Sequence, residues 1–168
     1  MKEVLTAVND FLLHFLKVPQ DIIVRGYQNL YALPQEDNYI LIANDYGKRV
    51  GTNVHEFEDY VYTTRALHEY VVTIDFCNHN EDMVYDMANT IEVISRSRLP
   101  CEFFHSYDME FLFCEDIKNI PFVNKENQYI YRYRVSLHLS AWEEYASPQE
   151  TANKASVYIE NVDAHHQP

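Results

Sequence analysis

Apolar and polar residues largely alternate from Gln128 to Trp142. Side chains on a β-strand point to opposite faces in turn, so this pattern predicts one strand with one apolar face. Residues 128–142 would span roughly 50 Å at about 3.4 Å per residue, much longer than a typical strand. Such a strand either curves through the centre of a β-rich domain or contacts another subunit. Its apolar face would comprise Tyr129, Tyr131, Tyr133, Val135, Leu137, Leu139 and Ala141.

Two segments have the 3.6-residue apolar period of an amphipathic α-helix. The first covers residues 2–16 and stops before Pro19, with an apolar stripe that includes Val4, Val8, Phe11 and Phe15. The second begins after Asn80, the expected N-cap, and runs to about Ser97 before Pro100 closes it. Its predicted buried stripe consists of Met83, Met87, Ile91 and Ile94, with Val84 and Ala88 beside it.

Short strands separated by turns account for most of the remaining pattern. We expect strands at residues 21–25, 39–43, 56–65, 69–77, 101–104, 109–114 and 154–163. Turns or loops are expected at 27–38, 44–47, 105–108 and 143–153, with a break at 67–68 and a loop at 47–53 that contains Gly47 and Gly51. Because most strands are joined by turns, the sequence predicts a single α+β domain over residues 1–163, with a flexible tail at 164–168. Its sheet would be mainly antiparallel, with two α-helices packed on one face and the long strand in the C-terminal half.

Composition narrows the function classes. The formal net charge of −13 makes the chain a poor candidate for wrapping nucleic acid, although an acidic wall could line a passage for DNA. The 14 tyrosines favour subunit contacts, where a ring is apolar on one side and wet on the other. Cys77, Cys101 and Cys114 are widely spaced, which predicts free thiols and a protein made in a cytoplasm.

Motifs for catalysis or cofactor binding are missing from the sequence. Three glycines cannot form a phosphate-binding loop, and neither GxSxG nor HExxH occurs. Asp75, Cys77 and His79 would share a strand face, but a partly buried strand edge explains them better than a metal site. Glu56, Glu58 and Asp59 favour a solvated acidic patch, and Cys114 beside Glu115 and Asp116 is a poor nucleophile because negative neighbours disfavour its thiolate. The His165-His166 pair could bind a metal only adventitiously, so we predict no enzyme, no cofactor and no metal.

The few basic residues are informative in such an acidic chain. Arg25 ends a predicted strand, Lys48 and Arg49 lie in the predicted 47–53 loop, and Arg132 and Arg134 share the polar face of the long strand. Arginines in this setting often meet carboxylates on a neighbouring subunit. The alternative for the last two is an intramolecular pair with Glu69 or Asp75.

Short motifs along nearly the whole chain resemble the neck or tail terminator family of tailed bacteriophages. The resemblance lies in the order and spacing of the motifs, none of which is catalytic. They are Arg25-Gly26-Tyr27-Gln28-Asn29, Arg49-x-Gly51-Thr52-Asn53, Pro100-Cys101-Glu102-Phe103-Phe104, Pro121-Phe122-Val123-Asn124 with Gln128-Tyr129, and Asn161-Val162-Asp163.

The resemblance implies a structural virion protein that forms a ring, usually a homo-hexamer, on the head-proximal end of the tail tube. Its partners would be the tail tube protein, a neck or head-completion protein and, in a contractile tail, a sheath-associated protein, while DNA passes through the lumen without specific binding. Another head–tail connector or tail-tube subunit is the alternative, and a small hydrolase or ligand-binding protein is a third. Residues 47–53 and 100–108 would be loops that reach a neighbouring ring. The predicted subunit contacts are Arg25, Arg49, Gly51, Asn53, Glu102, Phe103, Phe104, Tyr129, Arg132 and Arg134.

Overall fold

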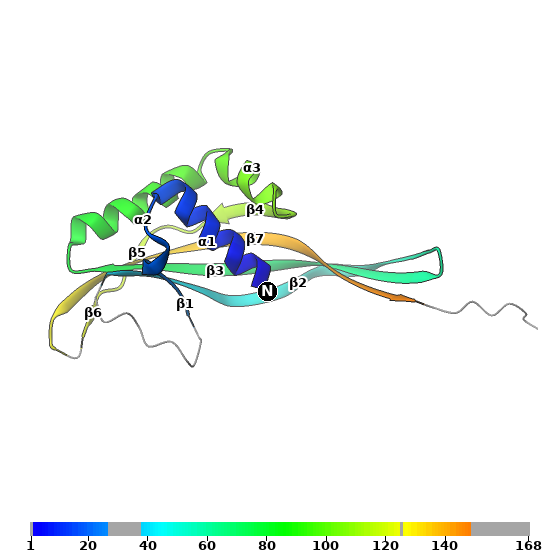
Figure 1. The fold of residues 1–168 in the computed structure, drawn as a ribbon, viewed down its shortest axis with the longest axis horizontal. Coiled ribbons are helices and arrows are strands. Elements are labelled where there is room, and N and C mark those ends of the chain that lie inside the picture. The colour runs from blue at the N-terminus through cyan, green and yellow to red at the C-terminus, as the bar shows by residue number, and fades with distance from the viewer. Residues whose placement is uncertain (1, 27–37, 125, 149–168) are drawn as a thin grey trace, which may run out of the picture.

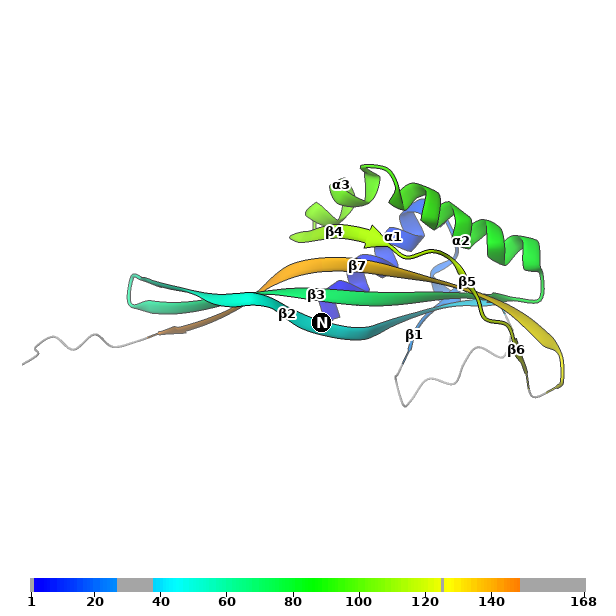
Figure 2. The same cartoon turned by 180° about the vertical axis from the view of Figure 1, so that it is seen from behind.

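A computed structural model describes residues 2–26, 38–124 and 126–148, which form a twisted sheet with three helices on one face (Figures 1 and 2). The predicted strand 154–163, the tail 164–168 and nearly all of the predicted loop 27–38 lie outside the described residues. The elements in chain order are α1 (Lys2–Leu16), the 3-10 helix η1 (Gln20–Ile22), β1 (Ile23–Arg25), β2 (Tyr39–Glu58), β3 (Val61–Asn78), α2 (Glu81–Ser95), α3 (Leu99–His105), β4 (Met109–Cys114), β5 (Lys118–Asn119), β6 (Phe122–Val123) and β7 (Tyr129–Pro148).

The sheet has the strand order β1-β2-β3-β7-β4, and β5 and β6 also pair with β7. β1 runs parallel to β2, whereas the other pairs are antiparallel. The α+β class is therefore right, but the sheet is mixed and three helices cover it instead of the predicted two.

Helices α1 and α2 follow the predicted segments. In α2 the N-cap is Asn80, whose side chain accepts a hydrogen bond from the Met83 backbone N–H at 3.3 Å. The predicted stripe needs one correction, because Met83 is exposed and Val84 is buried in its place. The buried positions of α2 follow i, i+3, i+4 and i+7 spacing, so its inner face is rotated from the predicted one. They are Val84, Met87, Ala88 and Ile91.

The predicted strand at residues 101–104 is wrong, because these residues belong to α3. Pro100 lies in the first turn of α3, where the missing proline N–H costs no helical hydrogen bond. Pro100 therefore lies at the start of α3 and also follows the end of α2. The ring of Phe104 is fully buried and stacks on that of Phe11 with centroids 5.0 Å apart. Residues 101–104 are too few for the spacing of their apolar positions to distinguish a helix from a strand.

The three long strands contain the largest differences from the sequence prediction. The predicted strands 39–43 and 56–65, the turn 44–47 and the loop 47–53 are replaced by β2 and its turn into β3. Register shifts interrupt the β2–β3 ladder at Asn44/Tyr46 and Val50/Val54, within the predicted turn and loop. The predicted break at 67–68 lies inside β3, and β7 continues to Pro148, six residues beyond the predicted Trp142.

The core lies between the helices and one face of the sheet, which we call the helix side; the opposite face is the helix-free face. Alternation along each strand assigns the residues to these faces. On the helix side, the fully buried residues include Ile40, Ile42, Val72, Ile74, Phe76, Val135, Leu137 and Leu139. Tyr129, predicted on the apolar face of the long strand, is 68% exposed at the start of β7.

Candidate subunit interface

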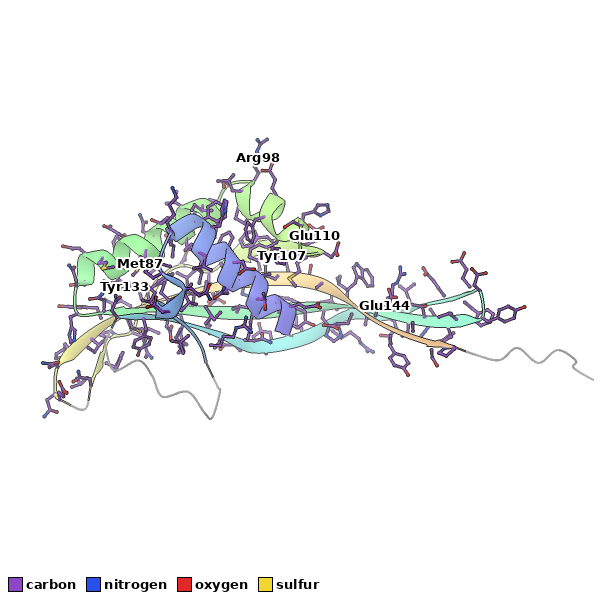
Figure 3. All side chains as sticks on the ribbon, viewed as in Figure 1. Met87, Arg98, Tyr107, Glu110, Tyr133 and Glu144 are labelled. Carbon is purple, nitrogen blue, oxygen red and sulfur yellow. The ribbon has the colours of Figure 1, made fainter. Side chains whose placement is uncertain are left out.

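Beyond the helices, β2, β3 and β7 continue as a three-stranded extension, which we call the arm (Figure 1). The arm comprises residues 46–58 of β2, the turn at 59–60, residues 61–69 of β3 and residues 142–148 of β7. Figure 3 shows side chains standing on both of its faces, with Glu144 near the point where β7 leaves the helices. Seven of the fifteen large apolar side chains that the described residues expose are on the arm: Tyr46, Val50, Val54, Phe57, Tyr60, Trp142 and Tyr145.

A tight turn closes the arm at its tip. Glu58 pairs with Val61, which leaves a two-residue loop of Asp59 and Tyr60. Both loop residues have positive φ, 48° and 63°, as a type I′ hairpin turn requires. This turn matches the right-handed twist of the flanking strands, so β2 and β3 pair up to the tip although no core lies beneath them.

Aromatic residues line the helix side of the arm. The His55 ring stacks on Tyr62 with centroids 5.6 Å apart, and its Nδ1 lies 2.8 Å from the Tyr62 hydroxyl and 3.1 Å from that of Thr64. Phe57 and Tyr145 are exposed on the same side. These rings present apolar surface, to which the tyrosines add a polar hydroxyl, and aromatic residues of this kind are enriched at protein interfaces.

On the helix-free face the arm has an open groove of about 370 Å³. Val54 and Trp142 give it an apolar lining, and Trp142 is 55% exposed. Arg65 spans its charged side, because its guanidinium lies 2.7 Å from Glu144 and 3.7 Å from Glu56. The two carboxylates therefore hold one cation among groups that remain in contact with water.

Basic and acidic side chains alternate across the sheet where the arm meets the core. We call these five residues the charge ladder: Lys48, Glu69, His138, Glu115 and Lys118. Lys48 Nζ lies 2.9 Å from Glu69, whose other carboxylate oxygen is 3.0 Å from Nδ1 of His138. On the far side of the His138 ring, Nε2 lies 3.2 Å from Glu115, and Glu115 accepts a 2.6 Å hydrogen bond from Lys118. Both ring nitrogens of His138 therefore lie within hydrogen-bond distance of a carboxylate oxygen.

The ladder shifts the acidity of its carboxyl groups. Hydrogen bonds from His138 and Lys48 lower the pKa of Glu69. Those from Lys118 and His138 likewise lower the pKa of Glu115. In both cases, donors that stabilise the carboxylate outweigh the opposing effect of burial. The ladder thus links β2, β3, β7 and β5 through side-chain contacts at the base of the arm.

A buried ion pair lies beside the ladder on the helix-free face. Arg134 donates from Nε and Nη2 to the two oxygens of Asp75, at 2.6 and 2.8 Å. Arg132 approaches the same carboxylate at 3.9 Å, and its Nε donates to the Ile120 carbonyl. The intramolecular alternative that the sequence left open, with Asp75 as the acceptor, is therefore present in the fold.

The structure brings together three of the predicted contact residues. Arg49, Gly51 and Asn53 lie on the arm at its β2 edge, where Arg49 donates to the Asn53 side chain at 3.3 Å. Gly51 has a φ of 77°, which glycine adopts without strain. The predicted loop 47–53 is thus an irregular strand edge.

The other predicted contacts are scattered. Arg25 ends β1 and donates to Thr6 of α1 at 3.0 Å, and Tyr129 stands far from the arm at the start of β7. Glu102 is exposed on α3 and pairs with Arg98 at 3.2 Å, whereas Phe104 is a core residue. The expected loop 100–108 is mostly α3, so its aromatic pattern reflects packing. The half-buried Phe103 packs against the same core.

The thiols of Cys77 and Cys114 are poorly suited to act as nucleophiles. Burial raises the pKa values of the Cys77 and Cys114 thiols to about 11, which disfavours the reactive thiolate. Within residues 2–26, 38–124 and 126–148, no cluster of His, Cys, Asp and Glu side chains could hold a metal ion. The carboxylate of Asp75, considered above with Cys77 and His79, instead binds Arg134. No helix in the described part of the chain is long and apolar enough to cross a membrane.

Comparison with known protein families matches residues 2–164 to the phage neck terminator protein family. The chain belongs to the phage neck terminator family. A comparison with curated protein sequences found no match. Family membership confirms the resemblance inferred from the short motifs and identifies a structural protein of the phage neck and tail.

In this neck terminator the main surface that the sequence analysis missed is the arm. Trp142, Val54 and Tyr145 were not among the predicted contacts, although all three are exposed there. A signal was present, because aromatic and β-branched residues form an unbroken run from Tyr60 to Thr64. That signal was obscured by Gly47 and Gly51 earlier in β2 and by the acidic residues Glu56, Glu58 and Asp59 directly before the run.

Proposed function

We propose that the neck terminator assembles into a closed ring, a homo-hexamer, that caps the head-proximal end of the tail tube and joins it to the neck. One observation carries the proposal: a three-stranded arm extends beyond the helices and exposes apolar side chains on both faces. A monomer gains little from such an arm, because its apolar groups stay in water. A ring buries them between copies through heterologous contacts, in which one patch meets a different patch on the next copy.

The ring acts by assembly and needs neither catalysis nor a cofactor. Its two ends would contact different partners, the tail tube protein on one side and a neck or head-completion protein on the other. A sheath-associated protein would join them if the tail is contractile. The acidic composition suits a lumen through which DNA moves without binding, since like charges repel. Assembly would take place in the host cytoplasm.

Among the predicted contact residues, this proposal favours the arm over the long-strand arginines. The carboxylate of Asp75 already satisfies Arg134 within the chain, in a bidentate geometry. Reversing Arg132 and Arg134 would therefore disturb the fold before it disturbed a neighbour. Arg49, Gly51 and Asn53 stand on the exposed arm and remain our proposed contacts.

Two matched variants test the arm. Trp142→Arg places a charge in the arm groove, and Val93→Arg places the same charge at an equally exposed apolar position on α2. Native mass spectrometry of the purified protein and electron microscopy of phage particles are the measurements. We expect the wild type and Val93→Arg to give rings and tails of uniform length, and Trp142→Arg to give monomers and tails of uncontrolled length. Particles that lack this protein at the tail–neck junction would refute the proposal.

A further inference from the structure

Among the described residues, the arm has two strand edges that no other strand covers, and near the base of the arm these edges differ in charge. In the part of the chain that the structure describes, β1 pairs with β2 only at Ile40–Ile42, so no strand covers residues 46–58. On the opposite side of the arm, β4 pairs with β7 only as far as Ala141, so no described strand beyond β3 pairs with residues 142–148. Unpaired backbone groups on such edges are templates for pairing with another chain.

Charge distinguishes the two edges. Near the base of the arm, the β2 edge carries Lys48 and Arg49, and the β7 edge carries Glu143 and Glu144. Most of these groups have partners inside the chain: Lys48 with Glu69, Glu144 with Arg65, and Glu143 as the acceptor of the Tyr70 hydroxyl. Among the described residues, Arg49 contacts only the neutral Asn53 side chain and no carboxylate. Its positive charge is therefore available for a partner.

From these edges we propose that the arms of neighbouring copies join side by side, with the β7 edge of one arm paired to the β2 edge of the next. This inference rests on the proposed ring. β2 and β7 are both antiparallel to β3, so equivalently oriented copies would form a parallel pair. Because each arm presents both edges, the contact repeats head to tail and can close.

The register of the arm specifies which side chains meet. Arg49 lies opposite His68, His68 lies opposite Ala141, and Glu143 is two residues further along β7. Arg49 and Glu143 therefore share the helix side of the sheet and lie at nearly the same height along the arm. In the joined arms, Arg49 of one copy binds Glu143 of its neighbour, whose second carboxylate oxygen keeps the Tyr70 contact.

Apolar contacts reinforce this pairing on the helix-free face. Trp142 shares that face with Val50, which aligns with it across Leu67, and with Val54. Side-by-side arms would place the exposed Trp142 ring next to the exposed Val50 and Val54 of the neighbouring copy. The same contact thus explains the ionic and the apolar features of the arm. An opposite-charge pair between strands, with an aromatic–β-branched pair beside it, is a favourable cross-strand arrangement.

Charge reversal and rescue test the pair. Arg49→Glu and Glu143→Arg should each raise the protein concentration needed for assembly by roughly tenfold, because like charges would then face each other. The double variant Arg49→Glu/Glu143→Arg should assemble as the wild type does. Arg96→Glu, an equal charge change at the residue that follows α2, is the control and should leave assembly unchanged. Failure of the double variant to recover would overturn the pairing if its circular dichroism and thermal unfolding match those of the wild type.

Cross-linking in assembled particles gives an independent readout. Within one chain, β3 separates Arg49 from Glu143 by about 10 Å, beyond the Cα separation of about 7 Å that a disulfide can bridge. Oxidised tails that carry Arg49→Cys/Glu143→Cys should therefore give a ladder of covalent oligomers, and either single cysteine variant should not. A ring without the ladder would overturn edge pairing and leave the proposed function intact. Tails without the protein would overturn both.

Discussion

The same three strands cross two different environments. In the core half of β2, β3 and β7, helix-side residues such as Ile42, Ile74 and Leu137 are fully buried beneath the helices. In the arm half, the strands keep their ladders but lose the helices, and Phe57 and Tyr145 are more than half exposed. Backbone pairing thus continues where burial stops. The comparison teaches that the core half stabilises the monomer, whereas the arm half contributes little until another chain covers it.

The largest difference in unfolding free energy is expected between two substitutions, one of an aromatic residue in the core and one of an aromatic residue in the arm. Phe104→Ala should lower the free energy of unfolding by about 3–5 kcal/mol, because it removes a fully buried ring that stacks on Phe11 and Phe111. Tyr145→Ala, at an exposed site, should change it by less than about 0.5 kcal/mol. Urea unfolding of the monomer measures both. Equal losses would show that the arm is part of the monomer core.

This contrast also explains how much of the fold the sequence could predict. In the core half, the apolar alternation of residues 133–139 and the stripes of α1 and α2 report real burial, so those elements were predicted well. In the arm half, the apolar period lapses because no core lies beneath it. Asn44 to Gly47 then resembled a turn, and residues 47–53 resembled a loop, although both belong to β2.

The candidate site was predictable only in part, for a related reason. Arg49, Gly51 and Asn53 were found through short motifs, and they do lie on the arm. Phe104 carried the same kind of motif signal yet belongs to the core. A motif of a few residues does not distinguish a contact kept for packing from one kept for assembly. Only the fold separates these cases, because it shows which side chains the helices cover.

The next-largest expected effect on the unfolding free energy comes from ion pairs, one in the core half and one in the arm half. The Arg134–Asp75 and Arg65–Glu144 pairs have nearly equal lengths, 2.6 and 2.7 Å. Asp75 is buried to 3% side-chain exposure, however, whereas Glu144 is 49% exposed. Asp75→Ala should therefore cost about 2–3 kcal/mol of unfolding free energy, and Glu144→Ala less than about 1 kcal/mol. Chemical denaturation of the two variants provides the measurement. Similar losses of unfolding free energy would contradict the conclusion that Asp75 is buried and Glu144 is exposed.

Acid should weaken the charge ladder, which joins the core half to the arm half. The unfolding free energy lost in this way should be smaller than that lost in Asp75→Ala. Glu69 and Glu115 have pKa values lowered in the fold, so they bind fewer protons in the folded than in the unfolded chain. Their stabilisation is complete above the ordinary glutamate pKa of about 4.3 and disappears as the pH falls through the lower folded values. Unfolding free energies measured from pH 7 down to pH 3 should show this loss. Glu115→Gln should flatten the curve, and an unchanged slope would exclude Glu115 as its source.

The smallest expected effect comes from substituting Gly51, which tests backbone strain in the arm without changing side-chain packing. A Cβ added at Gly51 would meet no atom within 4 Å, so Gly51→Ala creates no steric clash. The φ of 77° is nevertheless unfavourable for alanine, and the substitution should cost about 1 kcal/mol. Gly51→Asn should cost less, because asparagine tolerates the left-handed region better. Hydrogen exchange of the arm amides would reveal this cost as local opening while the core amides stay protected. If core protection fell equally, the arm and the core would unfold as one unit, and the distinction between the two halves would fail.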